Sequence, residues 1–304
     1  MNPLLKKCFA KYVPEVNLYL SRLSFTDAVG KSLFPSLEKA MHYSVDAKGK
    51  RLRPLLTIMA YRLLAEDWQR ALPVAAAYEL VHTYSLIHDD LPAMDNDDWR
   101  RGEPTNHKVF GEALAILAGD ALLTEAFRLL AAEVDAEPAI IVKLVAGLSQ
   151  AAGSDGMVGG QVLDISSEGL DVDQAGDSLL ELLDSLHRRK TGAMITGALV
   201  AGIDLAGGDL ELRFRLEKFG QLIGLAFQVA DDILDEVGDQ ENLGKDIGSD
   251  RELNKLTYVS LFGLEASRQK LLDLHREALS QIEPLGEKAD ELKALADYIV
   301  VRDR

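Results

Sequence analysis

Helical periodicity extends over nearly the whole chain, and no other feature limits its possible folds as strongly. Apolar residues recur every three or four positions, whereas the alternation typical of strands is nearly absent. Several segments are apolar on more than one face, as at residues 114–118, which favours helices at the centre of a bundle. We therefore predict one all-α domain over residues 1–304, a single large bundle with helices at 53–66, 72–91, 113–134, 140–151, 175–205, 211–237, 252–281 and 289–301.

Composition and charge limit the partners and the cellular location that the chain can have. The 304 residues are 47% hydrophobic and carry a net charge of −16, which disfavours nucleic acid and anionic membranes as partners. The most apolar stretch, residues 113–132, is interrupted by Asp120, Glu125 and Arg128, so it predicts a buried helix and no stable membrane insertion. The first twenty residues lack the pattern of a signal peptide, and the single cysteine, Cys8, excludes an internal disulfide. We expect a cytoplasmic protein.

Five carboxylates crowd together after a predicted helix, and we call them the first acidic cluster: Asp89, Asp90, Asp95, Asp97 and Asp98. Like charges this close raise each other's pKa unless a cation neutralises them, and Mg²⁺ prefers carboxylate oxygens. On an ideal helix Asp89 and Asp95 would diverge by about 120°. Pro92 disfavours a continuous helix, so we predict that the helix ends near residue 91 and that the chain turns Asp95 back beside Asp89. Taken alone, the cluster fits a solvated acidic loop equally well.

A second acidic cluster lies inside a strongly helical stretch and consists of Asp231, Asp232 and Asp235. Together with Gln228, these side chains fall within one helical stripe about 100° wide, and apolar residues flank them on both sides. Carboxylates on a helix that is otherwise buried are costly without partners, so this cluster is harder to explain as solvated surface. The two clusters together favour a pair of facing acidic helices with a central cavity between them.

Basic residues accompany both clusters. Arg100 and Arg101 follow the first cluster in a turn, and Lys245 and Lys255 follow the second. Arginine matches phosphate oxygens in a bidentate way and lysine supplies a compact charge, so these residues are suited to a diphosphate ligand. Ordinary surface salt bridges are the expected role of three other basic residues: Lys48, Arg51 and Arg188.

The order of these motifs resembles that of the trans-isoprenyl diphosphate synthases, and within them the bacterial farnesyl diphosphate synthases. The matching motifs stand at residues 49–54, 82–95, 100–102, 119–122, 159–161, 190–192, 227–235, 243–245 and 254–258. Their co-occurrence in this order, over nearly the whole chain, is far more specific than either acidic cluster alone. The resemblance implies an isoprenoid synthase bundle and a homodimer.

The resemblance also implies a reaction. An allylic diphosphate, dimethylallyl or geranyl, condenses head to tail and with trans geometry with isopentenyl diphosphate, mainly to farnesyl diphosphate. The implied cofactor is Mg²⁺, three ions per site, with Mn²⁺ as a substitute, and the implied ligands are Asp89, Asp90, Asp95, Asp231, Asp232 and Asp235. The residues implied to bind the allylic diphosphate are Arg100, Lys190, Lys245 and Lys255. Those implied for isopentenyl diphosphate are Lys50, Arg53, His82 and Arg101, and those implied to lie near the developing cation are Thr191 and Gln228.

Product length is a separate question. The resemblance nominates Tyr84 as the cap of a pocket that holds about fifteen carbons. On an ideal helix Ser85 is nearly in register with Asp89, whereas Tyr84 is turned aside, so geometry alone does not nominate it. Tyr84 also fits plain core packing. The chain departs from the usual family pattern at Lys48, Ala230 and Asp246.

Other functions fit the sequence less well. A geranyl or geranylgeranyl diphosphate synthase of the same family differs only in product length. A carboxylate-bridged di-iron bundle needs a Glu-x-x-His from each of two helices, and Glu79 with His82 is the only such pair. A terpene cyclase needs no second diphosphate site. Lys50, Arg53 and Arg101 favour such a second site and therefore argue against a cyclase. A non-catalytic synthase subunit commonly lacks aspartates of one cluster, and both clusters are complete here.

Overall fold

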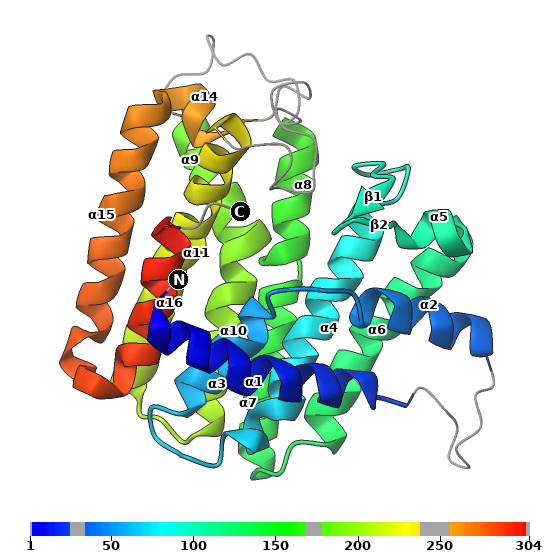
Figure 1. Ribbon diagram of the computed structural model, residues 1–304, viewed down its shortest axis with the longest axis horizontal. Helices are drawn as coiled ribbons and strands as arrows, with labels where there is room; N and C mark the ends of the chain where they lie inside the picture. The colour runs from blue at the N-terminus through cyan, green and yellow to red at the C-terminus, as the bar shows by residue number, and fades with distance from the viewer. Residues whose placement is uncertain (1, 25–33, 168–177, 238–255, 302–304) are drawn as a thin grey trace.

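The computed structural model describes residues 2–24, 34–167, 178–237 and 256–301, and helices account for most of them (Figure 1). This confirms the predicted all-α class. The elements up to residue 152 are α1 (Pro3–Ser21), α2 (Pro35–Val45), α3 (Leu52–Tyr61), η1 (Trp68–Ala71), α4 (Leu72–Asp89), β1 (Trp99–Arg100), β2 (Glu103–Pro104), α5 (Asn106–Phe110), α6 (Glu112–Ala132) and α7 (Pro138–Ala152). The later elements are α8 (Met157–Ser167), α9 (Ser178–His187), η2 (Arg188–Gly192), α10 (Ala193–Leu205), α11 (Leu210–Val237), α14 (Tyr258–Phe262), α15 (Leu264–Ile282), η3 (Glu283–Ala289) and α16 (Asp290–Val301).

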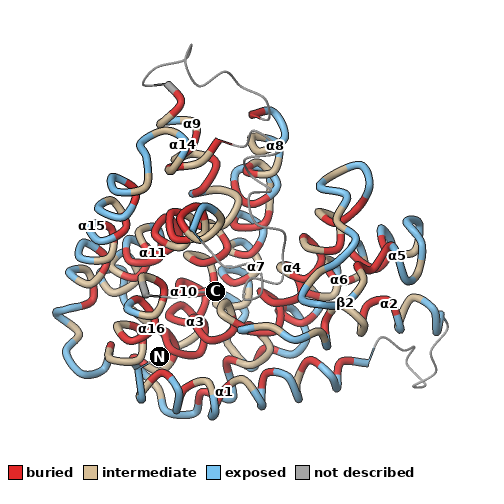
Figure 2. Tube along the Cα trace, turned by 45° about the horizontal axis from the view of Figure 1, so that its top comes forward, coloured by how far each residue is buried: buried red, intermediate tan, exposed pale blue. Residues whose placement is uncertain are grey.

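Helices α3, α4 and α10 form the centre of the bundle, where burial is nearly complete (Figure 2). Every residue of α3 from Pro54 onward and every residue of α4 from Val74 to Val81 is buried. Gly202 allows α10 to approach α3, because a Cβ at this position would lie 2.2 Å from the Thr57 carbonyl oxygen. Removal of this apolar surface from water, at about 25 cal/mol per Å², is the main stabilising term.

Residues 114–118 lie in α6, and the prediction that they are buried on several faces is wrong. Helix α6 packs against α4, but Ile116 and Leu117 are 43% and 54% exposed. The helix stands at the side of the bundle (Figure 1), so only the stripe through Ala115, Ala118 and Leu122 reaches the core. Within the described part of the chain, no helix combines the length and hydropathy needed to cross a bilayer.

Several helix boundaries differ from the prediction. Within 175–205 the chain forms α9 and α10, joined by the π-helical turn η2. Residues 252–255 of the segment 252–281 lie outside the described residues, and the helical part is interrupted at Gly263, which has a φ of 77°. Helices α1, α2 and α8 and the hairpin β1–β2 were not predicted. The hairpin has only two residue pairs, and α8 contains Gly159 and Gly160, which lower helix propensity.

Arg51 is buried, so the prediction of a surface salt bridge is wrong. Its side chain donates to the Glu79 carboxylate at 2.8 Å, to the Val45 and Ala47 carbonyl oxygens at 2.7 and 3.1 Å, and to Asn17 at 2.8 Å. A buried guanidinium needs acceptors for its N–H groups, and these four supply them. The chain between α2 and α3 is thereby tied to α1 and α4.

Replacing Glu79 with alanine would leave the Arg51 charge buried without its carboxylate partner. We expect the free energy of unfolding, measured by urea denaturation, to fall by about 3–5 kcal/mol. Glu66→Ala is the control, because Glu66 pairs with Arg62 at the surface with 88% of its side chain exposed, and such pairs contribute little. Equal losses in the two variants would contradict the importance of the buried pair.

Candidate functional site

The first acidic cluster begins where α4 ends and the chain folds back on itself. The last residue of α4 is Asp89, and the Asp95 backbone N–H donates a hydrogen bond of 2.9 Å to the Asp89 carbonyl oxygen. Asn96, with a φ of 53°, donates to the Leu91 carbonyl oxygen at 3.1 Å. The predicted return of Asp95 to Asp89 is therefore confirmed.

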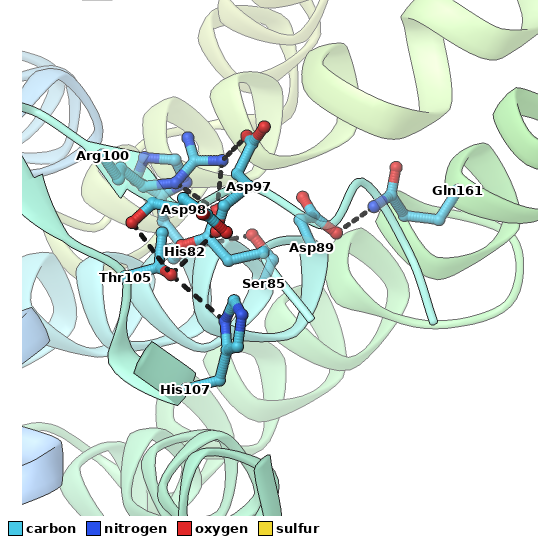
Figure 3. Close-up of polar contacts among 10 residues, drawn as sticks. His82, Ser85, Asp89, Asp97, Asp98, Arg100, Thr105, His107 and Gln161 are labelled. Atoms are coloured by element: carbon cyan, nitrogen blue, oxygen red, sulfur yellow. Dashed lines mark hydrogen bonds and ion pairs between the residues drawn. The ribbon is translucent and has the colours of Figure 1, made fainter. Parts of the chain in front are cut away.

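Strand β1 of the hairpin brings Arg100 back to this cluster (Figure 3), and Arg101 follows in the turn of the hairpin. The Arg100 Nε donates to Asp90 Oδ1 at 2.6 Å, and its Nη2 donates to Asp97 Oδ2 at 3.2 Å. Asp90 is 3% exposed, so water screens this pair weakly. Arg101 has a left-handed φ of 58°. The Asp90 carboxylate thus orients Arg100, and metal binding by Asp90 stays a prediction.

Thr105 and His107 fix the acidic loop through one hydroxyl (Figure 3). The Thr105 hydroxyl donates to the Asp97 carbonyl oxygen at 2.8 Å and lies 3.1 Å from the His107 Nδ1. Because its single proton goes to Asp97, Thr105 accepts from the Nδ1–H of His107. Sequence reasoning missed both residues, since a threonine and a histidine near an acidic loop have no distinctive spacing.

Helix α8 contacts Asp89 from another side, as the close-up shows (Figure 3). The Gln161 side-chain amide donates to the Asp89 carboxylate. Asp164, one turn further on the same face of α8, forms an ion pair with Lys190. Gln161 belongs to a matched motif but had no predicted role, and Asp164 was not predicted at all. Their i, i+3 spacing indicates a shared face only once this segment is recognised as a helix.

The π-helical turn η2 places Lys190 and Thr191 between α8 and α11. A Cβ at Gly160 of α8 would lie 2.2 Å from the Lys190 backbone nitrogen, so glycine permits this close approach. Thr191 Oγ1 donates to Gln228 Oε1 at 2.6 Å. The two side chains predicted to lie near the developing cation are therefore in contact. Short π-helical turns occur frequently at functional sites.

The second acidic cluster lies on α11, one turn beyond Gln228. Asp232 is 7% exposed and accepts a hydrogen bond of 2.8 Å from the Tyr258 backbone N–H, whereas Asp231 and Asp235 are half-buried. Helices α4 and α11 both run toward the end of the bundle that carries β1 and α14 (Figure 1). Among the described residues, no three His, Cys, Asp or Glu side chains form a ready metal site. Either cluster would need further oxygen ligands to hold a cation.

Arg53, His82 and Arg101 form a basic cluster beside the first acidic cluster. Burial and the nearby arginines, Arg53 first, lower the pKa of His82, so this histidine is neutral. Burial lowers the pKa of Arg53 to about 10, with Glu79 opposing the shift and Arg101 adding to it. A Cβ at Gly49 would lie 2.8 Å from the Arg101 Nη1, so glycine leaves room for this guanidinium. Positive charge gathered on poorly solvated side chains favours a ligand with several negative charges.

The other predicted lysines are placed differently. Lys50 is exposed at the start of this region, with its Nζ 5.7 Å from the centre of the Tyr298 ring. Lys245 and Lys255 lie outside the described residues, as does Asp246. Arg188 pairs with Asp184 at 3.5 Å and is 62% exposed, which confirms its predicted surface role.

Asp89 is an acid whose charge is poorly stabilised. Burial raises its pKa to about 6; Asp95 and Asp90 add to the shift, and Lys190 and Arg100 oppose it. A raised pKa means that the ionised carboxylate lacks sufficient favourable partners. A divalent cation would be such a partner, because it binds the carboxylate in its ionised form.

Tyr84 and Ser85 lie on α4 just before the cluster. Tyr84 is 7% exposed, and its ring meets the His88 ring edge-on with 5.6 Å between the centres. The Ser85 hydroxyl donates to the His82 carbonyl oxygen at 2.9 Å, so it is already engaged within the helix. A role of either residue in product length stays a prediction.

The chain is similar to known proteins over most of its length. Residues 34–298 match the family model described as polyprenyl synthetase. A farnesyl diphosphate synthase of Geobacillus stearothermophilus is 50% identical over 245 residues, which are 80% of each chain. A heterodimeric geranylgeranyl pyrophosphate synthase large subunit of Arabidopsis thaliana is 49% identical over 88% of this chain and 72% of its own. The solved structure of an FPP/GFPP synthase of Zymomonas mobilis superimposes with a TM-score of 0.82 at 36% identity, over 98% of this chain and 99% of that one.

Gly160→Ala tests the close approach of α8 to Lys190. The new Cβ would collide with backbone, so α8 must shift away from the turn, and we expect a loss of about 1–3 kcal/mol in the free energy of unfolding. Gly147→Ala is the matched control in α7, because its Cβ would meet only the Tyr78 hydroxyl at 4.0 Å. Alanine there should be neutral or stabilise by up to about 1 kcal/mol. Similar thermal denaturation curves for the two variants would contradict this packing argument.

Proposed function

The chain belongs to the polyprenyl synthetase family and is a prenyltransferase, and from this premise we propose that it makes mainly farnesyl diphosphate. Its substrates would be isopentenyl diphosphate and the allylic dimethylallyl and geranyl diphosphates. Relatives named farnesyl diphosphate synthase are 50% and 45% identical. A geranylgeranyl product is the alternative, because relatives named for it are 49% and 46% identical.

One observation carries this proposal: side-chain contacts link the first cluster to the second across α8 and η2. Asp89 accepts from Gln161 on α8, Asp164 of the same helix pairs with Lys190, and Thr191 contacts Gln228 on α11. Asp231 follows Gln228 by one turn. Both clusters thus border one region, which also holds a lysine, a hydroxyl and an amide. These contacts support the proposal that an allylic diphosphate ionises in this region.

The donor set suits Mg²⁺. All expected ligands are carboxylates, and Mg²⁺ binds one or two protein carboxylates together with substrate phosphate oxygens and waters. Asp89, Asp95 and Asp231 are the ligands that we propose, with Asp232 and Asp235 completing or supporting them and Asp90 acting mainly on Arg100. When bound, the cations would supply Lewis-acid stabilisation of the leaving diphosphate.

The residues of the chain would then act on the two substrates. Arg100 and Lys190, together with Lys245 and Lys255, would bind the allylic diphosphate, whose carbon–oxygen bond breaks. The Thr191 and Gln228 dipoles would stabilise the allylic cation without trapping it as a strong nucleophile would.

Isopentenyl diphosphate would lie with its diphosphate at Lys50, Arg53, His82 and Arg101. Its double bond attacks the cation, which forms the new carbon–carbon bond. The released diphosphate then takes the proton that is lost.

We further infer a cytoplasmic homodimer. A second copy could cover the exposed Ile116 and Leu117 of α6, which are 43% and 54% exposed and follow one another on the side of the bundle. Family membership supports the dimer as well. Analytical ultracentrifugation would decide between one and two chains.

Incubation with isopentenyl and dimethylallyl diphosphates tests the function directly. With Mg²⁺ we expect farnesol as the main alcohol after dephosphorylation and chromatography, because the condensation occurs twice. Chelation of the metal by EDTA should abolish the product, and added Mg²⁺ or Mn²⁺ should restore it. Absence of any new carbon–carbon bond with both substrates present would refute the proposed activity.

Tyr84→Ala tests the proposed cap of the product pocket. If the ring blocks further growth, its removal should shift the main product from fifteen to twenty or more carbons, measured by chromatography of the alcohols. Tyr84→Phe is the matched control, because it keeps the ring and should keep the product length. A fifteen-carbon product from the alanine variant would assign Tyr84 to core packing alone.

A further inference from the structure

A residue outside α11 holds Asp232 of the second acidic cluster. Its Oδ2 accepts the Tyr258 backbone N–H at 2.8 Å, and 7% of Asp232 is exposed. A carboxylate with this little access to water depends on such donors for its position. The position of Tyr258 therefore contributes to the position of this acid.

Tyr258 is itself fixed by α9. Its hydroxyl donates to Asp184 Oδ1, and its ring stacks on the His187 ring with 5.8 Å between the centres and 30° between the planes. Burial, with Asp184 adding to the effect, raises the pKa of Tyr258, so the hydroxyl keeps its proton and can donate. Burial lowers the pKa of His187 to about 4, so the stacked imidazole is neutral.

Helix α9 leads directly into the turn that carries Lys190. His187 is the last residue of α9, and Arg188, the first residue of η2, follows it. Tyr258 therefore contacts the acidic helix through its backbone and the helix before Lys190 through its side chain. Thr257 and Ser260 form a capping box that fixes the start of α14 and with it the backbone of Tyr258.

We propose that Tyr258 is a positioning residue that holds Asp232 and the lysine-bearing turn in register for the metal-bound diphosphate. The inference rests on the proposed function, because it assigns the diphosphate and its cations to this region. Tyr258 itself would touch neither substrate nor metal. Its effect passes through the Asp184 hydrogen bond on one side and the Asp232 hydrogen bond on the other.

Tyr258→Phe tests this by removing the hydroxyl and keeping the ring. Isothermal titration calorimetry with Mg²⁺ and inorganic diphosphate, without organic substrate, should show affinity weaker by about tenfold, as for other residues that orient metal ligands. Tyr61→Phe is the matched control, because the hydroxyl of Tyr61, the last residue of α3, donates to Asp67 at 2.8 Å, away from the site. It should leave the affinity unchanged.

Two further variants separate position from charge. Asp184→Asn keeps an oxygen that accepts the Tyr258 hydroxyl and should bind Mg²⁺ and diphosphate as the unmodified protein does. Asp184→Leu removes the acceptor and should weaken the affinity as much as Tyr258→Phe does. The double variant should bind no more weakly than either single variant. Unchanged affinity in Tyr258→Phe, or an equal loss in Tyr61→Phe, would overturn the inference.

Measurements on the unmodified protein show whether the role of Tyr258 or the proposed function itself has failed. If it makes the prenyl product and binds Mg²⁺ with diphosphate while Tyr258→Phe binds equally well, only the role of Tyr258 is refuted. If the unmodified protein binds no diphosphate in the presence of Mg²⁺, the proposed function fails with it.

Discussion

Carboxylates that share a poorly solvated space repel one another. The site is built from the hydrogen-bond donors and positive side chains that offset this repulsion. In the first cluster, Asp90 and Asp97 both accept from Arg100, and Asp89 accepts from the Gln161 amide. Asp89 nevertheless keeps a raised pKa because burial outweighs these partners. On α11, Asp232 is stabilised by a backbone N–H. The protein supplies enough stabilisation to fold and leaves a surplus of negative charge that favours cations.

The basic cluster of Arg53, His82 and Arg101 shows the same balance with the opposite sign of charge. Burial and mutual repulsion lower the pKa of Arg53, and His82 is kept neutral. Glu79 is the acid that opposes this repulsion, and it is already paired with Arg51. A region of excess negative charge and a region of excess positive charge therefore stand side by side at the end of α4. Two diphosphate groups, one with cations and one without, are complementary to such a pair.

Features that depend on neighbours in the chain were predictable from the sequence. Pro92 and the spacing of Asp89 and Asp95 predicted the backbone turn that joins them, and the helical stripe predicted Gln228 on the same helix as Asp231. Features that depend on distant contacts were not. Asp164 forms its ion pair with Lys190 of a distant segment, and Arg51 is buried against Glu79, which reaches it from α4. The π-helical turn has no sequence period that differs visibly from a continuous helix, and Gly160, which packs against it, is distant in the sequence.

The left-handed backbone of Arg51 and Arg101, with φ of 51° and 58°, has a consequence for engineering. A side chain in this conformation costs roughly 1–3 kcal/mol, and glycine would relieve that cost. Backbone conformation alone would therefore favour glycine at both positions in a heat-tolerant variant. At Arg101 glycine would also remove a guanidinium from the basic cluster, so stability and the proposed diphosphate binding are opposed there. At Arg51 glycine would remove the side chain that joins α1, α2 and α4, and the loss of these buried hydrogen bonds outweighs the relief of the backbone.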